Sequence, residues 1–345
     1  MFFITLFEFC INLLYTTLEI SKKQALKLGN MDQFYDKLKE FGDVKLNESL
    51  AKHTTFKIGG PAKFFIIVRK NDLLVRLMNY LAAEGVSYLV LSGGSNLLLN
   101  DAGYDGLVIK IATNDPPEMT AKGLGFEIAI NAGVSLGMVV NLSAKNSLAG
   151  MDWAVGVPGT FGGAIRGNAG AMGKDISTVT QWVEIWRDGE VIKITNAECG
   201  FAYRDTIFKR NRDIILRACI YLEPGDKQKI MENMQAHLKQ RKHTPFPSAG
   251  SFFKNLKLDK WPGDKKDLPE LFLQRGSVPV GWMTDQLGLR GLSAGGAKIS
   301  DEHGNYVINF NNATQADVLI LVEEIKQRVY NKFGVELEPE VQIIK

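Results

Sequence analysis

Several segments of the sequence combine residue types that can bind a cofactor or do chemistry. The first is SGGSN, which follows directly after an apolar run. Gly93 and Gly94 allow successive main-chain N–H groups to point at one anion, and Ser95 and Asn96 add side-chain donors. The pattern predicts a phosphate or pyrophosphate loop, although a plain tight turn would use the same residues. Because the pattern is not GxGxxG, a Rossmann site is disfavoured.

The second segment is the glycine-rich stretch GVPGTFGGAIRGNAG over residues 156–170. A stretch of this kind lets the main chain lie flat against a planar ligand while its N–H groups bond the heteroatoms of that ligand. A flexible linker is the alternative. However, Val157, Phe161 and Ile165 are apolar anchors that a solvated linker would not need. We therefore favour a cofactor cradle.

Two further segments place an arginine and a serine in polar surroundings. In AYRDTIFK, Arg204 stands between Tyr203 and Asp205. Such a guanidinium can hold a carboxylate or phosphate, but a surface salt bridge fits the spacing better. In PSAGSFFKN, Ser251 lacks a GxSxG context and has no His or Asp placed to activate it, so a hydrolase nucleophile is disfavoured. A turn or capping serine is the alternative.

The last segment is VELEPEVQII at residues 335–344. With the two-residue period of a strand, Glu336, Glu338 and Glu340 share one face, and apolar residues share the other. Three glutamates on one face usually form a solvated edge, and a carboxylate buried at a reaction centre is the less common alternative. Pro339 confines the strand to a sheet edge or to a break.

An α+β fold must position these segments. Residues 63–69 and 87–91 read as strands on either side of a helix that begins near Asn71 and ends at Gly85. The pattern continues with strands at 126–130, 183–194 (a hairpin with an Asp-Gly turn) and 214–221, and with helices at 227–241 and 314–333.

Composition excludes several classes of protein. The 345 residues are 45% apolar and 23% charged, the balance of a globular protein of about two domains. A net charge of +3 is too small to predict a nucleic-acid partner. The three widely spaced cysteines predict no disulfide framework, and the four histidines show no metal spacing. A reducing, cytoplasmic compartment and no metal are expected.

The N-terminal 30 residues need a separate interpretation. Residues 1–20 are rich in apolar side chains, but Glu8 interrupts them and no basic region or cleavage site accompanies them. They are too interrupted for a membrane-spanning helix, so no membrane partner is expected. Since Met31 opens a plausible protein start, we expect residues 1–30 to be an extension outside the fold. A membrane-surface anchor is the alternative.

Taken in order, HTTFKIGGPA, GGSN, VPGTFGGA, GNAGA, YRDTIFK, SAGSFFKN and LEPEV resemble the UDP-N-acetylenolpyruvoylglucosamine reductases, flavoenzymes of bacterial cell-wall precursor synthesis. Each motif alone is weak, but together and in the family's order they are highly specific, and they span His53 to Gln342. The resemblance implies a two-part FAD-binding domain of the non-Rossmann, vanillyl-alcohol-oxidase-like type at residues 31–221, split near 112. A smaller α+β substrate domain would occupy residues 222–345.

The resemblance also implies the chemistry. NADPH would reduce non-covalently bound FAD, and the reduced flavin would pass the hydride to an enolpyruvyl sugar nucleotide, giving UDP-N-acetylmuramate. Arg204 would polarise the substrate carboxylate, Glu340 would assist in its protonated form, and Ser251 would donate the proton, with Lys254 as a candidate helper. Thr160 would reach the reactive nitrogen of the flavin. The implied cofactor contacts are Gly93, Gly94, Ser95, Asn96, Val157, Pro158, Gly159, Thr160, Gly163, Asn168 and Ala169.

Substrate contacts are expected at Tyr203, Arg241, Lys242, Lys254 and Asn255, with Arg241 or Lys242 on the diphosphate. The short interval before Ser251 indicates the branch of the family that lacks a long substrate-covering loop with a tyrosine. One alternative is a flavin oxidase of the same fold that acts on sugars or lactones, in which a histidine often tethers FAD; no histidine lies in the flavin segments here. The other is a sugar-nucleotide-binding protein without activity, which would be expected to have lost one of the three implied catalytic residues.

Overall fold

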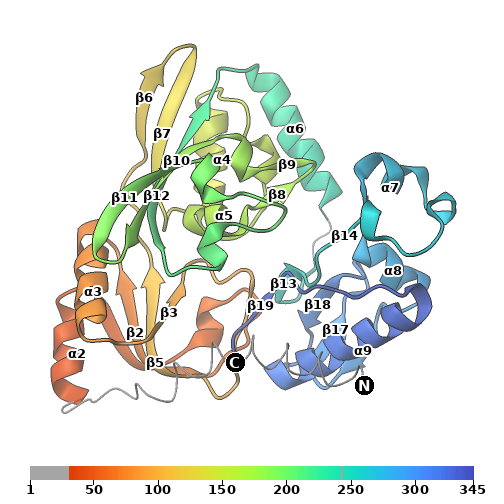
Figure 1. Cartoon of the computed structure of the whole chain (residues 1–345), viewed down its shortest axis with the longest axis horizontal. Helices are drawn as coiled ribbons and strands as arrows, with labels where there is room; N and C mark the ends of the chain where they lie inside the picture. The colour runs from red at the N-terminus through yellow and green to blue at the C-terminus, as the bar shows by residue number, and fades with distance from the viewer. Residues whose placement is uncertain (1–30, 242–243) are drawn as a thin grey trace, which may run out of the picture.

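The protein is described here by a computed structural model that covers residues 31–241 and 244–345. Figure 1 shows two sheets with their helices, built from the first two thirds of the chain, and a smaller unit built from the last third. The mixture of helices and strands confirms the predicted α+β class. The predicted N-terminal extension at 1–30 lies outside the described residues. Within the described ranges, no helix is both long and apolar enough to cross a membrane.

The first sheet has the strand order β1 (Asp43–Ser49), β2 (Pro61–Val68), β5 (Tyr104–Ile111), β3 (Tyr88–Leu91). Helices α2 (Met31–Lys39) and α3 (Asn71–Ala83) cover one face, where Phe34 meets Phe64 edge to face with ring centroids 5.1 Å apart. Phe65 points to the opposite face and joins a separate apolar cluster, as the period of two requires. Since β3 is an edge strand, the SGGSN loop that follows it leaves the sheet at its border.

The second sheet is antiparallel, in the order β11 (Glu190–Thr195), β10 (Thr180–Arg187), β12 (Ile214–Leu222), β7 (Gly125–Asn131), β6 (Glu118–Lys122). The predicted hairpin is confirmed: Arg187 pairs with Glu190, and Asp188 and Gly189 both have positive φ, as a type I′ turn requires. Helices α4 (Leu136–Lys145), α5 (Phe161–Gly167) and α6 (Lys227–Gln240) contribute buried side chains to the same core. This core is continuous with that of the first sheet.

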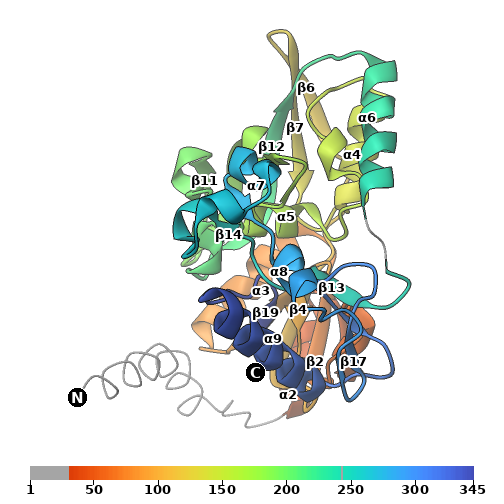
Figure 2. The same cartoon turned by 90° about the vertical axis from the view of Figure 1, so that its right-hand side faces the viewer.

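The last third has its own sheet, β13 (Ser248–Ser251), β18 (Tyr306–Asn309), β17 (Ala297–Ile299), β16 (Ser293–Ala294), and its own core. Helices α7 (Glu270–Arg275), α8 (Val280–Gln286) and α9 (Gln315–Phe333) complete it (Figure 2). As predicted, α9 starts at Thr314, which forms a capping box with Asp317, and stops at Gly334. The buried side chains of α9 belong to the same apolar core as those of β17 and β18.

After α9 the chain returns to the first domain. The terminal strand is shorter than predicted: only β19 (Gln342–Ile343) is a strand, and it pairs in parallel with β4 (Leu97–Leu98). Pro339 lies just before it and has no N–H to donate to a ladder. Because β4 directly follows the SGGSN loop, β19 joins the C-terminal unit to that loop.

Burial supports a domain boundary different from the expected one at residue 222. Ile230 and Met234 of α6 belong to the core of the second sheet, whereas buried side chains from Ala249 onward belong to the C-terminal core. We therefore propose a boundary near residue 241. The last strand of the first sheet ends at Ile111 and the first strand of the second sheet begins at Glu118, so the expected division near residue 112 falls between the two sheets.

Candidate active site

A cavity of about 1920 Å³ brings the predicted segments together. Its lining includes residues from both glycine-rich segments, from the turn at Arg204, from β13 and from the C-terminal segment. The predicted site residues that line it are Gly93, Gly94, Ser95, Asn96, Val157, Pro158, Gly159, Thr160, Gly163, Ala169, Arg204, Arg241, Ser251 and Glu340. Segments from opposite ends of the chain thus share one cavity.

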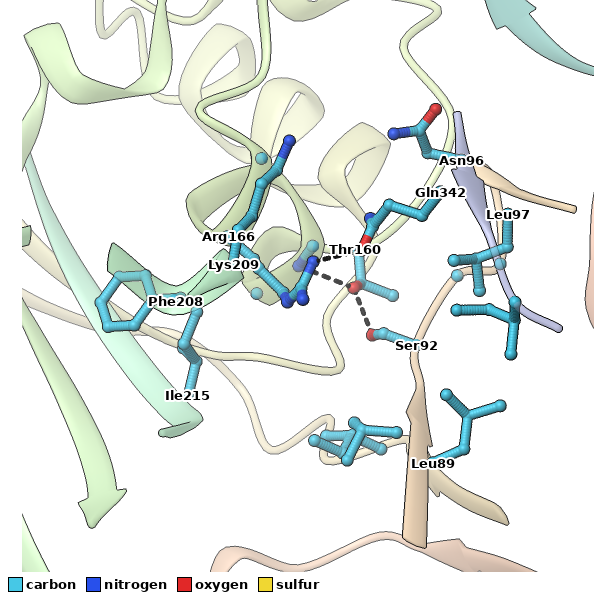
Figure 3. A pocket seen from close by; sticks show the side chains of 18 of the residues that line it. Leu89, Ser92, Asn96, Leu97, Thr160, Arg166, Phe208, Lys209, Ile215 and Gln342 are labelled. Carbon is cyan, nitrogen blue, oxygen red and sulfur yellow. Dashed lines mark hydrogen bonds between the residues drawn. The ribbon is translucent and has the colours of Figure 1, made fainter. Parts of the chain in front are cut away.

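The two glycine-rich segments touch each other within this cavity. A Cβ atom on Gly93 would lie only 2.6 Å from Cα of Gly159, so neither segment has room for a side chain at the contact. Beside it, the Ser92 and Thr160 hydroxyl oxygens lie 2.5 Å apart, and Figure 3 shows the two side chains pointing toward one another. The Ser95 hydroxyl also donates to the Pro158 carbonyl at 3.4 Å. The two segments therefore form one continuous surface of main chain.

This surface fits the FAD that the sequence implies. Among the described residues, no acceptor bonds the main-chain N–H groups of Gly94 and Ser95, so both can bond the oxygens of a pyrophosphate. Because Gly93 and Gly159 meet without side chains, main chain alone would form the floor beneath a ring system at this point. Thr160 caps α5 by accepting a hydrogen bond from the Gly163 N–H at 3.3 Å, which fixes its side chain at the edge of that floor.

Arg204 enters the cavity from a tight turn. The N–H groups of Ala202 and Asp205 each donate to the other residue's carbonyl, at 2.9 and 3.1 Å, and Arg204 adopts a left-handed φ of 56°. Its Nε lies 2.7 Å from Oε1 of Glu340. The N–H is not aligned with that oxygen, so the contact is an ion pair rather than a well-formed hydrogen bond. The remaining guanidinium donors can bond a ligand.

Main-chain contacts from two units fix the position of Glu340. Its N–H donates to the Phe252 carbonyl at 2.8 Å, and its carbonyl accepts from the Asn96 side-chain amide at 3.0 Å. Burial raises the pKa of the Glu340 carboxyl, while the cations of Arg204 and Lys209 oppose that rise. The solvated-edge interpretation of the three glutamates is therefore wrong for Glu340.

Ser251 is the last residue of β13 and lies opposite Tyr306 of β18. The next residue, Phe252, accepts the hydrogen bond from the Glu340 N–H, so Ser251 and Glu340 stand on adjacent segments. The residues at 204, 251 and 340 thus line the same cavity. Arg204 lies in a turn, Ser251 ends a strand and Glu340 lies in the C-terminal segment, so no short sequence motif contains more than one of them.

Other predicted residues do not line the cavity. Tyr203 lies beside the Arg204 guanidinium, with its ring 5.5 Å from Cζ, and its hydroxyl accepts from the Asn255 N–H. Lys254 is paired with Glu338. Lys242 lies outside the described residues.

Two further residues that were expected to contact a ligand form hydrogen bonds to main-chain carbonyls. Asn168 is buried, and its amide donates to the Ala202 carbonyl at 2.9 Å, so its side chain faces the arginine turn rather than the cavity. Arg241 does line the cavity, but its guanidinium also donates to the carbonyls of Val155 and Trp153 at 2.6 and 3.0 Å. Arg241 therefore supports the segment that leads into residues 157–160.

Several residues that line the cavity are not predicted from the sequence. Arg166 donates to the Gln342 side chain at 2.7 Å, and Lys209 lies next to it (Figure 3). Both cations stand inside motifs that were recognised, Arg166 in the glycine-rich stretch and Lys209 at the end of YRDTIFK. Ser92 immediately precedes GGSN. Within the described ranges, no group of three or more His, Cys, Asp or Glu side chains could hold a metal ion.

Comparisons with known proteins agree with this geometry. Residues 62–195 match the family model described as an FAD binding domain. Residues 240–344 match the model for the UDP-N-acetylenolpyruvoylglucosamine reductase C-terminal domain. The fold and the site define a flavoprotein oxidoreductase, and the predicted non-Rossmann FAD-binding fold with a smaller substrate domain is confirmed.

Individual relatives narrow this class to one family. The reductase of Caldanaerobacter subterraneus subsp. tengcongensis is 37% identical over 316 residues, covering 90% of this chain and 97% of that protein. The Bacillus subtilis enzyme is 35% identical over 89% of this chain and 96% of its own length. The crystal structure of the Thermus caldophilus enzyme superimposes with a TM-score of 0.68 at 30% identity, over 88% of this chain and 99% of that one. The chain belongs to the UDP-N-acetylenolpyruvoylglucosamine reductase family.

The contact at Gly93 predicts a specific effect on cofactor binding. Gly93→Ala pushes its new methyl group against Gly159, and displacing main chain in this way typically costs about 1–3 kcal/mol. We expect the dissociation constant for FAD, measured by flavin fluorescence on the apoprotein, to rise about tenfold or more. Gly137→Ala, on α4 with open space around the new methyl group, is the matched control. Unchanged FAD affinity in the Gly93 variant would refute the cradle.

Proposed function

We propose that this protein reduces the enolpyruvyl ether of UDP-N-acetylglucosamine to UDP-N-acetylmuramate, a step of peptidoglycan precursor synthesis. It is an FAD-containing oxidoreductase that uses NADPH, as its family membership supports. The observation that carries the proposal is the shared cavity of Arg204, Ser251 and Glu340, which also includes both glycine-rich segments. The substrate is a small sugar nucleotide.

The reaction determines what the cavity must supply. FAD held by the two glycine-rich segments would supply hydride-transfer chemistry, with NADPH as the source of the hydride and the alkene carbon distal to the substrate carboxylate as its acceptor. Negative charge then develops on the carbon next to that carboxylate and spreads onto the carboxylate oxygens. The site therefore needs a cation and a hydrogen-bond donor at the carboxylate, and a proton donor over the adjacent carbon.

Arg204 and Glu340 meet the first requirement. The guanidinium retains donors that can bind a carboxylate in the plane of the fork. Glu340, whose pKa is raised by burial, can stay protonated and donate its proton in a hydrogen bond to the same carboxylate. A protonated carboxyl avoids repulsion of the substrate anion, which an ionised Glu340 would cause.

Ser251 meets the second requirement by donating its hydroxyl proton to the carbon next to the carboxylate. A serine hydroxyl is a weak acid, so the oxygen left behind needs nearby positive charge or a proton relay. Lys254 is paired with Glu338 and does not line the cavity, whereas Arg204 and Lys209 do. We therefore assign the positive charge that supports Ser251 to Arg204, which lines the same cavity, rather than to Lys254.

The rest of the ligand-binding surface follows from the lining. Gly94 and Ser95 would hold the pyrophosphate of FAD, and residues 157–160 would hold its ring. Arg241 would contact the substrate diphosphate with the part of its guanidinium that does not bond main chain.

The described cysteines Cys199 and Cys219 are free thiols, which supports a reducing, cytoplasmic location.

The role of Ser251 predicts that the two half-reactions respond differently to mutation. In Ser251→Ala, NADPH should bleach the flavin as in the wild type, because that step needs no proton at the substrate. Reoxidation by the enolpyruvyl sugar nucleotide without oxygen should slow by about 10²–10⁴-fold. Stopped-flow absorbance measures both steps, with Ser248→Ala of the same strand as the control. Equal slowing of both steps would argue against proton donation, and reoxidation by oxygen alone would favour an oxidase.

The role of Glu340 predicts a pH dependence. Since burial raises its pKa, the protonated form persists to higher pH than for an ordinary glutamate, and reoxidation by substrate should slow as pH rises through that pKa. Glu340→Gln cannot ionise, so its rate, although lower, should lose this alkaline decline. Glu336→Gln, exposed on the same segment, should keep the wild-type profile. An identical decline in the Glu340 variant would show that another group is responsible.

A further inference from the structure

The turn that carries Arg204 holds a conformation that arginine does not favour. Arg204 is the second central residue of a four-residue turn and has a φ of 56°. That position usually takes glycine or asparagine, and a non-glycine residue there costs about 1–3 kcal/mol unless its surroundings hold it. The space on the far side of the guanidinium is also tight, since a Cβ atom on Gly170 would lie 3.2 Å from its Nη1. The turn therefore needs external support.

One support comes from Lys209, immediately beyond the turn. Its ammonium donates to the Arg204 carbonyl at 2.6 Å, which fixes the peptide plane that follows the left-handed residue. Phe208 is buried in the core of the second sheet and anchors the short helix that carries Lys209. No carboxylate among the described residues forms an ion pair with Lys209. Its strongest contact is therefore with main chain.

A second support comes from Asn168, on the other side of the turn. Its side-chain amide donates to the Ala202 carbonyl at 2.9 Å, and its side-chain oxygen accepts from the Ser177 N–H at 3.3 Å. Asn168 is only 3% exposed, and it ends α5, the helix that Thr160 begins. A rigid element of the flavin cradle therefore holds the first residue of the arginine turn.

We propose that Lys209 and Asn168 are positioning residues for the reduction: from opposite ends they hold the turn at residues 202–205, so that the Arg204 guanidinium faces Glu340 and the substrate carboxylate. The inference rests on the proposed function and adds two residues to it. Neither residue needs to touch the substrate. Lys209→Met removes the hydrogen bond to the Arg204 carbonyl. Asn168→Gly removes the hydrogen bond to the Ala202 carbonyl and the one from the Ser177 N–H, and glycine tolerates the left-handed φ of 43° at position 168.

A positioning role predicts a kinetic signature that depends on Arg204. Each single variant should slow reoxidation by the enolpyruvyl sugar nucleotide by up to about 10²-fold, because misplacing a binding group by about 1 Å has that effect. Bleaching by NADPH should be unchanged. In an Arg204→Ala background, at a pH below the alkaline decline, the same substitutions should change the rate by no more than about twofold, because the group they position is already absent.

The charge of Lys209 gives a second readout. The groups that influence Glu340 are the cations of Arg204, Lys209 and Lys254 and the phenols of Tyr203 and Tyr306. Lys209 lowers the pKa of Glu340, so Lys209→Met should move the alkaline decline of reoxidation to higher pH. Lys326→Met on α9 and Asn312→Gly, at another left-handed asparagine, are the matched controls and should leave rate and profile unchanged.

Three outcomes would overturn the inference: full effects of both substitutions in the Arg204→Ala background, equal slowing of both half-reactions, or wild-type rates in both single variants. If the proposed function is wrong, the sugar nucleotide will not reoxidise the reduced flavin even in the wild-type protein. In that case the support of the arginine turn is tested by a crystal structure of the Lys209→Met, Asn168→Gly double variant. The inference requires Arg204 to leave the left-handed region there, and an unmoved turn contradicts it.

Discussion

The site depends on the contact between Arg204 and Glu340, because it joins the arginine turn in the middle of the chain to the C-terminal segment. A carboxylate buried without a partner is costly, and a nearby cation offsets part of that cost. Here burial outweighs the cation, so the pKa of Glu340 is raised. A raised pKa favours the protonated carboxyl, which is the form that the proposed hydrogen bond to the substrate carboxylate requires.

That pair forms only because the C-terminal segment returns to the first domain. β19 pairs with β4, the Asn96 side chain holds the Glu340 carbonyl, and Phe252 accepts from the Glu340 N–H. One segment therefore aligns the SGGSN loop, the end of β13 and the arginine turn. The close contact of Gly93 with Gly159 then sets the floor beneath them. The proposed cofactor cradle and the proposed substrate-binding groups are thus held in place by the same few contacts.

Local sequence patterns predicted the elements much better than the site. The positions of β2, α3, β7, α6, α9 and the Asp-Gly hairpin follow from periodicity, caps and turn chemistry, all of which act over a few residues. The chemistry of Arg204 and Glu340 does not. The neighbouring sequence alone indicates a surface salt bridge for Arg204 and a solvated strand edge for Glu340. It does so because the residues that bury these two side chains lie far away in the sequence. Only the order of the motifs indicated that these residues act together.

Long-range contacts also explain why the positions of Asn168 and Lys209 could not be predicted from the sequence. Asn168 stands in a glycine-rich motif, which suggests cofactor contact, yet its side chain bonds the Ala202 carbonyl. Lys209 ends a recognised motif, but its contact is with main chain, which has no sequence signature. Support of a strained turn is visible only when φ and hydrogen bonds are known.

The central claim is that the three groups at positions 204, 251 and 340 act on one substrate. A crystal structure with FAD and the enolpyruvyl sugar nucleotide tests it most directly. The account predicts that the substrate carboxylate bonds the Arg204 guanidinium and the Glu340 carboxyl, with the Ser251 hydroxyl oxygen about 3–3.5 Å from the neighbouring alkene carbon. A substrate carboxylate bound away from Arg204, or an alkene out of reach of Ser251, would contradict it.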